Sequence, residues 1–157
     1  MLRLILIFYF IFNTLASEEY FLSLRNDKVN LRLGPSFDYP IKIIYKKKYL
    51  PVLIKEKSEN FRKIQDHENN SGWIHISQLS KKKSGLTVED TVLHKNPTIY
   101  SKPLANIKTG RLLIVLKCKK DWCKIKTESY SGWVKKGSIW GRIWNYLGAT
   151  LEAQNLS

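Results

Sequence analysis

Two cysteines and three histidines are the side chains of this sequence that most readily take part in catalysis or metal binding. A cysteine or serine nucleophile needs a histidine and a group that orients it, and a structural zinc site needs paired ligands on both sides of a loop. His67, His75 and His94 stand in three separate segments, and Cys118 and Cys123 form a single pair. Because the pattern fits neither chemistry, we expect no enzyme activity, no metal and no cofactor.

Residues 1–16 have the features of a secretory signal peptide. Met1-Leu2-Arg3 supplies the basic start, Leu4 to Phe12 an apolar run, and Thr14-Leu15-Ala16 a cleavage site of small residues. The apolar run is far shorter than the roughly 20 residues that cross a bilayer as a helix, although a retained anchor is the alternative. We therefore expect a periplasmic or secreted protein.

Export places the two cysteines in an oxidising compartment, where a disulfide is the default. If residues 112–118 and 122–127 form a hairpin around Lys120-Asp121, Cys118 faces Cys123 as a non-hydrogen-bonded pair, the closer kind. The same register places Leu116 opposite Ile125. We predict a disulfide between Cys118 and Cys123, with two free thiols as the alternative.

Two Gly-Trp dipeptides organise the rest of the chain. Gly72-Trp73 and Gly132-Trp133 each close a segment that begins with a short apolar strand and passes through a charged turn and an aromatic residue, which is Phe61 in the first segment and Trp122 in the second. Short alternating runs between frequent turns are typical of a small β-barrel. The offset of about sixty residues indicates an internal duplication.

The predicted architecture is all-β, with two small β-barrels in tandem. The expected segments are a signal peptide (1–16), a first barrel (20–80), a linker (81–85), a second barrel (86–141) and a C-terminal tail (142–157). The run Leu112–Leu116 is apolar on both faces, so we expect it to dock on the first barrel.

The tail is expected to be a short helix or an extension, because its apolar residues recur at helical spacing but Gly141 and Gly148 disfavour a helix. The tail would cover the open end of a barrel or serve as a docking strip for a partner or a membrane surface. The residues of the stripe are Trp140, Ile143, Trp144, Leu147 and Leu151.

The chain is strongly basic, with 27 Lys and Arg against 13 Asp and Glu and a net charge of +14. Such a charge attracts polyanions and anionic surfaces. Nucleic acid is disfavoured as a partner, because the basic residues are dispersed and export removes the protein from nucleic acid. The lysine runs at 46–48 and 81–83 are interpreted as solvated turns, and peripheral contact with a membrane stays open.

A candidate ligand site follows from strand alternation around Trp73. If Ile74 and Ile76 point into the barrel, Trp73 points the other way, towards a loop that carries two aromatic residues. Rigid aromatics beside cations suit a sugar or peptide that bears carboxylates. Packing of Trp73 against the loop or the second barrel is the alternative. The candidate residues are Arg32, Phe37, Tyr39, Lys42 and Trp73.

The motifs in both copies resemble the bacterial SH3-like (SH3b) domains of exported proteins, particularly the tandem type of alphaproteobacteria. The first copy has Val29-Asn30-Leu31-Arg32-Leu33-Gly34-Pro35 as an opening motif and Gly72-Trp73-Ile74-His75 as a closing one. The second copy has Trp122-Cys123-Lys124-Ile125 and Gly132-Trp133-Val134. The signature residues of the repeat are Gly34, Pro35, Gly72, Trp73, Trp122, Gly132 and Trp133.

This sequence departs from the family pattern at three places. Phe61 stands where a Trp is usual, Tyr49 stands where a Gly is usual, and Leu93-His94-Lys95-Asn96-Pro97 replaces the Arg-x-Gly-Pro motif in the second copy. The resemblance implies a binding or targeting module for cell-wall material or envelope proteins, without a cofactor. We predict a non-enzymatic periplasmic module that binds peptidoglycan or another anionic component of the cell envelope. The alternative is a scaffold subunit of an envelope protein complex.

Overall fold

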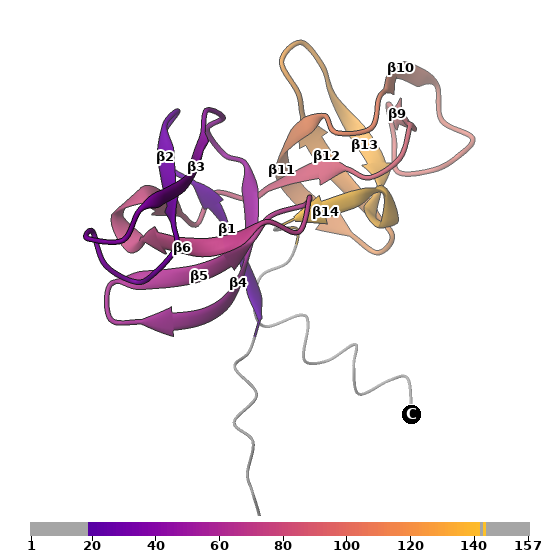
Figure 1. Ribbon diagram of the computed structural model, residues 1–157. Coiled ribbons are helices and arrows are strands. Elements are labelled where there is room, and N and C mark those ends of the chain that lie inside the picture. Colours follow the sequence, from indigo (N-terminus) through magenta and orange to yellow (C-terminus); the bar gives the residue numbers. More distant parts are fainter. Residues whose placement is uncertain (1–18, 142, 144–157) are drawn as a thin grey trace, which may run out of the picture.

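The computed structural model describes residues 19–141 and residue 143, which fold into two seven-stranded antiparallel sheets. Figure 1 shows the two sheets side by side. The expected signal peptide and nearly all of the expected tail lie outside the described residues. Within the described part, no helix is long and apolar enough to span a membrane.

The first sheet, which we call copy one, contains β1 to β7 and a short 3-10 turn, η1. Its elements are β1 (Tyr20–Leu24), β2 (Val29–Arg32), β3 (Ile41–Tyr45), β4 (Pro51–Ser58), β5 (Phe61–Gln65), β6 (Ser71–His75), η1 (Ile76–Gln78) and β7 (Leu79–Ser80). The second sheet, copy two, has the elements β8 (Ser84–Thr87), β9 (Thr91–His94), β10 (Pro103–Ile107), β11 (Leu112–Lys119), β12 (Trp122–Lys126), β13 (Ser131–Lys135), η2 (Lys136–Ser138) and β14 (Ile139–Gly141).

The two sheets have the same topology, strand for strand. The spatial order is β3-β2-β6-β5-β4-β1-β7 in copy one and β10-β9-β13-β12-β11-β8-β14 in copy two. Each strand of copy two therefore corresponds to the strand of copy one whose number is lower by seven, from β8 and β1 to β14 and β7. The predicted all-β fold of two tandem SH3-like barrels is confirmed.

The passage between the copies is short. β7 ends at Ser80 and β8 begins at Ser84, where it pairs with β11 of its own sheet. Of the residues expected in the linker 81–85, Ser84 and Gly85 thus belong to a strand of copy two. A side chain at Gly85 would meet the side chain of Ile139 on β14, so glycine allows the two strands to approach.

Each copy has its own core of buried aliphatic side chains, and residues of copy two also pack into the core of copy one. Leu86 of β8 is buried in the core cluster of copy one, and Leu112 of β11 packs against the same cluster. The run 112–116 was expected to dock on copy one, and its first residue does so. Leu116 at its other end is 49% exposed.

A β-bulge explains the exposure of Leu116. In the β11–β12 pair, Val115 lies opposite Ile125 and the next partners are Lys117 and Lys124, so Leu116 is the extra residue. The prediction that Leu116 faces Ile125 was wrong for this reason. The β4–β5 pair has a bulge at the equivalent place, between Ile54 and Glu56.

Trp140 lies in strand β14, so it does not begin a helix as its spacing had suggested. Its ring meets that of Phe21 on β1 edge to face, with the ring centroids 4.9 Å apart. Trp140 therefore joins the two copies. Of the other residues of the predicted stripe, Ile143 packs against the core of copy two, and the rest lie outside the described residues.

The predicted disulfide is present. Cys118 and Cys123 lie opposite each other in the β11–β12 hairpin, their Cα atoms are 4.0 Å apart, and the next pair is Lys119 with Trp122, as expected. Lys120 in the two-residue turn has a φ of 52°, which matches the turns that join closely paired strands.

Candidate functional site

The candidate site lies on the outer face of copy one, the face of β4, β5 and β6 that points away from the core. The strand registers place Glu56, Lys63, Trp73 and Arg32 in one row across four strands. Residues opposite each other in antiparallel strands share a face, so Trp73 lies between two cations. Trp73 is half-buried.

The Gly-Trp motif is explained by the close approach of β2 to its neighbour β6. A Cβ atom at Gly72 would lie 2.7 Å from the carbonyl oxygen of Arg32, and one at Gly132 would lie 2.7 Å from the carbonyl oxygen of His94. Backbone atoms cannot move aside as a flexible side chain can. Glycine is therefore required at both places, and the tryptophan that follows it is held on the outer face.

Arg32 positions the loop between β2 and β3. Its Nη1 atom donates hydrogen bonds to the carbonyl oxygens of Phe37, at 3.0 Å, and Tyr39, at 2.8 Å. The guanidinium also lies 5.5 Å from the centroid of the Phe37 ring. Two of its five donors are thus used within the protein, and the loop is fixed on the outer face.

Phe37 is the most exposed aromatic residue of the candidate site, with 63% of its surface accessible. Its ring packs against Phe61 and His75, with centroid distances of 5.2 and 5.1 Å. Neither Phe61 nor His75 was among the residues predicted for the site. Strand pairing could have placed them there, because Phe61 begins β5 and His75 ends β6, and the two residues lie directly opposite each other.

The other two candidate residues lie at the edges of this surface. The Tyr39 ring covers Gly34, where a Cβ atom would come within 2.5 Å of it, and Tyr39 is 46% exposed. Lys42 donates a hydrogen bond from Nζ to the carbonyl oxygen of Ser71, at 2.9 Å. The structure thus brings Arg32, Phe37 and Trp73 onto one face and places Tyr39 and Lys42 beside it.

The turn between β5 and β6, next to Lys42, is built on a buried carboxylate. Asp66 is 2% exposed and accepts hydrogen bonds from the backbone N–H groups of Glu68 and Asn70, the Asn70 side chain and the Tyr45 hydroxyl, which lies at 2.8 Å. Burial raises the pKa of Tyr45 far above its usual range, and the hydrogen bond to Asp66 adds to this effect.

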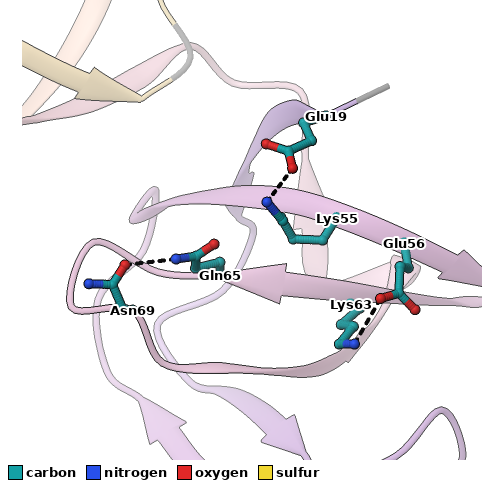
Figure 2. A network of polar contacts seen from close by, with 6 residues as sticks. All are labelled: Glu19, Lys55, Glu56, Lys63, Gln65 and Asn69. Atoms are coloured by element: carbon teal, nitrogen blue, oxygen red, sulfur yellow. Dashed lines mark hydrogen bonds and ion pairs between the residues drawn. The ribbon is translucent and has the colours of Figure 1, made fainter. Parts of the chain in front are cut away.

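Figure 2 shows the polar contacts that surround this turn and the neighbouring strands. Gln65 donates a hydrogen bond to Asn69 across the turn at 2.7 Å, and Lys63 pairs with Glu56 at 2.8 Å. Lys55 pairs with Glu19 near the start of the described chain. Lys63, one of the two cations beside Trp73, is therefore paired with a carboxylate within copy one.

The same face of copy two has a different composition. Its rows are Lys117, Lys124, Trp133 and His94, then Lys119, Trp122 and Lys135, and Lys126 lies beside them on β12. The Nζ atom of Lys117 lies 5.8 Å from the centroid of the Trp133 ring. We call the five lysines and Trp133 the lysine face.

His94 occupies the position of Arg32 and, like Arg32, contacts the loop that follows its strand. Its Nδ1 lies 3.3 Å from the carbonyl oxygen of Ser101 in the β9–β10 loop, and its ring is 5.3 Å from that of Trp122. The loop of copy two is thus tied to its own outer face. This function of His94 shows what replaces the missing Arg-x-Gly-Pro motif.

A groove of about 420 Å³ also lies between the copies. Leu112 and Ile114 of copy two line it together with Tyr49 of copy one, and basic side chains surround it. Tyr49 has a φ of 64°, in the left-handed region that glycine adopts most readily.

Comparison with known proteins gives one family and several solved structures. The family model described as bacterial SH3 domain matches residues 25–81 and again residues 88–141. No curated protein is similar in sequence to this chain.

Among solved structures, the chain is similar to NlpC2 from Trichomonas vaginalis, at 11% identity and a TM-score of 0.37 over 83% of this chain and 50% of that one. It is also similar to an NlpC/P60 family protein from Bacillus cereus, at 12% identity and a TM-score of 0.35 over 76% of this chain and 55% of that one. The chain thus spans about half the length of these proteins. Since the family model matches both copies, the chain belongs to the bacterial SH3 domain family.

Proposed function

We propose that this protein is a non-enzymatic binding module of the cell envelope, acts outside the cytoplasm, and holds peptidoglycan on the outer face of copy one. Bacterial SH3 domains are in general cell-wall binding modules and typically act outside the cell or in the periplasm. Two such domains make up most of this chain. The family therefore supports a binding function for the whole chain.

The observation that carries the proposal is the exposed ring of Phe37. Phe37 is 63% exposed, yet its ring contacts Arg32, Phe61 and His75, which restrain it. A rigid aromatic surface binds with little loss of conformational entropy, and one face of a sugar ring is apolar enough to pack on it. The remaining donors of Arg32 are suited to the carboxylates of wall peptides.

The chemistry of the histidines and cysteines also supports binding over catalysis. Both cysteines are joined in the disulfide. His75 contacts the Ser77 hydroxyl and two phenylalanine rings, and His94 contacts a backbone carbonyl and Trp122. Within residues 19–141 and 143, no three His, Cys, Asp or Glu side chains are grouped so that they could hold a metal ion.

The direct test is cosedimentation of the full chain with purified peptidoglycan sacculi. Phe37→Ala is expected to weaken binding about 30-fold, because central aromatic residues of a binding site contribute about 2 kcal/mol or more. Trp73→Ala is expected to act in the same direction. Ile99→Ala is the matched control, because Ile99 takes the place of Phe37 in the equivalent loop of copy two.

Binding that is unchanged in both Phe37→Ala and Trp73→Ala would refute the proposed site. Unfolding of each variant is followed by circular dichroism, so that loss of the fold is not mistaken for loss of the site. Phe37 is mostly exposed, and its substitution is expected to leave the fold intact.

The alternative is a scaffold subunit that docks on another envelope protein. Exposed apolar residues on the edge strand β3, Ile41 and Ile44, and Leu116 at the bulge of β11 favour it. Salt separates the two functions, because an electrostatic contribution to sacculus binding weakens at a few hundred millimolar salt. A stable, salt-resistant complex with an envelope protein would indicate the scaffold.

A further inference from the structure

The lysine face differs from the equivalent face of copy one in almost every charged position. Lys117, Lys119, Lys126 and Lys135 stand where copy one has Glu56, Ser58, Gln65 and His75, and Lys124 stands where copy one has Lys63. The tryptophan at the centre is the same. The outer face of copy one carries both positive and negative side chains, whereas the lysine face has five lysines and no acidic residue.

The lysines of this face have no carboxylate partner among the residues that the structure describes. Lys117 lies directly opposite Lys124, and like charges in opposite positions of a sheet destabilise it. The substitution of Lys117 for the Glu56 of copy one also removes the ion pair that Lys63 has there. Repulsion between the lysines therefore destabilises the free protein, and a bound anionic surface would relieve this repulsion.

The β9–β10 loop borders the lysine face and carries exposed apolar residues. Tyr100 is 91% exposed and Ile99 is 57% exposed. His94 ties the loop to Trp122 on the outer face. In copy one the position of Tyr100 is taken by Asp38, so an acid has been replaced by an aromatic residue at the tip.

The base of this loop is basic as well. The backbone N–H of Lys95 donates to the carbonyl oxygen of Lys102, and both side chains are exposed. The equivalent pair in copy one is Leu33 and Pro40, with the same backbone hydrogen bond. Two further lysines therefore flank the apolar tip.

We propose that the lysine face and the 95–102 loop form a docking surface for an anionic lipid bilayer. The lysines would lie against the phosphate headgroups, each contributing electrostatic attraction. Tyr100 and Ile99 would lie in the interfacial zone of the bilayer, where aromatic side chains are favourable. A soluble polyanion would neutralise the lysines, but it offers no apolar region for the loop tip, and this favours the bilayer.

This inference goes beyond the proposed function, because it assigns copy two a separate binding surface. Copy one would hold cell-wall material while copy two lies on a membrane. The two activities rest on different residues, so either can fail without the other.

The test measures partitioning of the full chain into vesicles of phosphatidylcholine with about 30% phosphatidylglycerol and into vesicles of phosphatidylcholine alone. The difference between the two vesicles is the readout, because the N-terminal apolar run is present in both arms. We expect binding to the anionic vesicles that falls steeply with salt. Equal partitioning into both vesicles would overturn the proposal.

The decisive variant is Lys124→Gln with Lys135→Gln, which is expected to lower partitioning into anionic vesicles about 25-fold, roughly fivefold for each lysine. The matched control is Lys28→Gln with Lys57→Gln, which removes the same charge from exposed positions of copy one and is expected to change partitioning about twofold or less. Equal losses in the two variants would overturn the proposal, because net charge alone would then explain the binding.

Tyr100→Ser separates a bilayer from a soluble polyanion. We expect about tenfold weaker partitioning into anionic vesicles, because the tip loses its aromatic ring, and unchanged binding of soluble polyphosphate. If Tyr100→Ser changes neither interaction while the lysine variant weakens both, the occupant is a soluble polyanion and the membrane proposal is wrong.

Discussion

Copy one and copy two have the same strand order and the same bulges, yet they are stabilised in different ways. Copy one has the buried Tyr45–Asp66 network in its β5–β6 turn, and Ile107 and Thr127 stand at these places in copy two. Copy two has the disulfide, and Lys57 and Arg62 stand at those places in copy one. The common topology thus depends on the shared core and glycines, and each copy adds its own local restraint.

The outer faces of the two copies also share a common feature and differ in the residues around it. Both present a tryptophan after an obligatory glycine, but copy one surrounds it with aromatic residues and an ion pair, whereas copy two surrounds it with lysines. Duplication followed by divergence on the surface gives two binding faces on one chain.

The largest expected effect is that of Asp66→Ala. Removal of this buried carboxylate leaves the Tyr45 hydroxyl and several donors of the turn without a partner, which is expected to cost about 3 kcal/mol of unfolding free energy. Thr127→Ala at the equivalent place in copy two is expected to cost less than about 0.5 kcal/mol. Chemical denaturation of both variants measures this, and similar losses would show that the copies do not differ here.

Removal of the disulfide comes next. Replacing Cys118 and Cys123 together by serine is expected to lower the free energy of unfolding by about 2 kcal/mol, since the bond closes only a short loop. Hydrogen exchange is expected to speed up in β11 and β12 while β4 and β5 keep their protection. A uniform increase in both copies would contradict separate local restraints.

The raised pKa of Tyr45 predicts a dependence on alkaline pH. Below about pH 10 the tyrosine is protonated in the folded and the unfolded chain, and its contribution is fully present. As the pH rises above this value the unfolded chain loses the proton first, so stability falls by up to about 1.4 kcal/mol per pH unit. Tyr45→Phe is expected to show a shallower decline. If Tyr45→Phe and the unchanged protein lost stability equally at alkaline pH, Tyr45 would not be the group responsible.

The smallest expected effect concerns the turn before β4 and β11. Tyr49 and Gly110 are equivalent residues, and their φ values of 64° and 74° both lie in the left-handed region. Gly110→Ala is expected to cost about 1 kcal/mol, and Tyr49→Gly to gain less than this. Thermal unfolding measures both changes, and stabilisation by Gly110→Ala would show that the turn has another conformation.

Much of this comparison could be predicted from the sequence. Gly72 and Gly132, with the tryptophans that follow, marked equivalent strands, and the spacing of Cys118 and Cys123 predicted their pairing. These signals are local, because strand alternation and turn length determine them. The bulge at Leu116 was missed, because an extra residue in one strand leaves no mark in the alternation of a run that is apolar throughout.

The candidate site was predicted in part. Alternation placed Trp73 on the outer face, but the contact of Phe37 with Phe61 and His75 depends on how the loop folds back, which spacing does not determine. Trp140 was assigned to a helix because its apolar neighbours fit the helical period, whereas pairing of β14 with β8 decides its conformation. Long-range pairing overrides a local period in this case.

The central claim, that the two outer faces bind different components of the envelope, is tested most directly by a crossed binding measurement at about 150 mM salt. Phe37→Ala and the double variant Lys124→Gln with Lys135→Gln are each assayed against sacculi and against anionic vesicles. We expect Phe37→Ala to lose binding to sacculi and to keep binding to vesicles, and the lysine variant to lose binding to vesicles and to keep binding to sacculi. Loss of both components in either variant would contradict it, since one shared surface would then bind both.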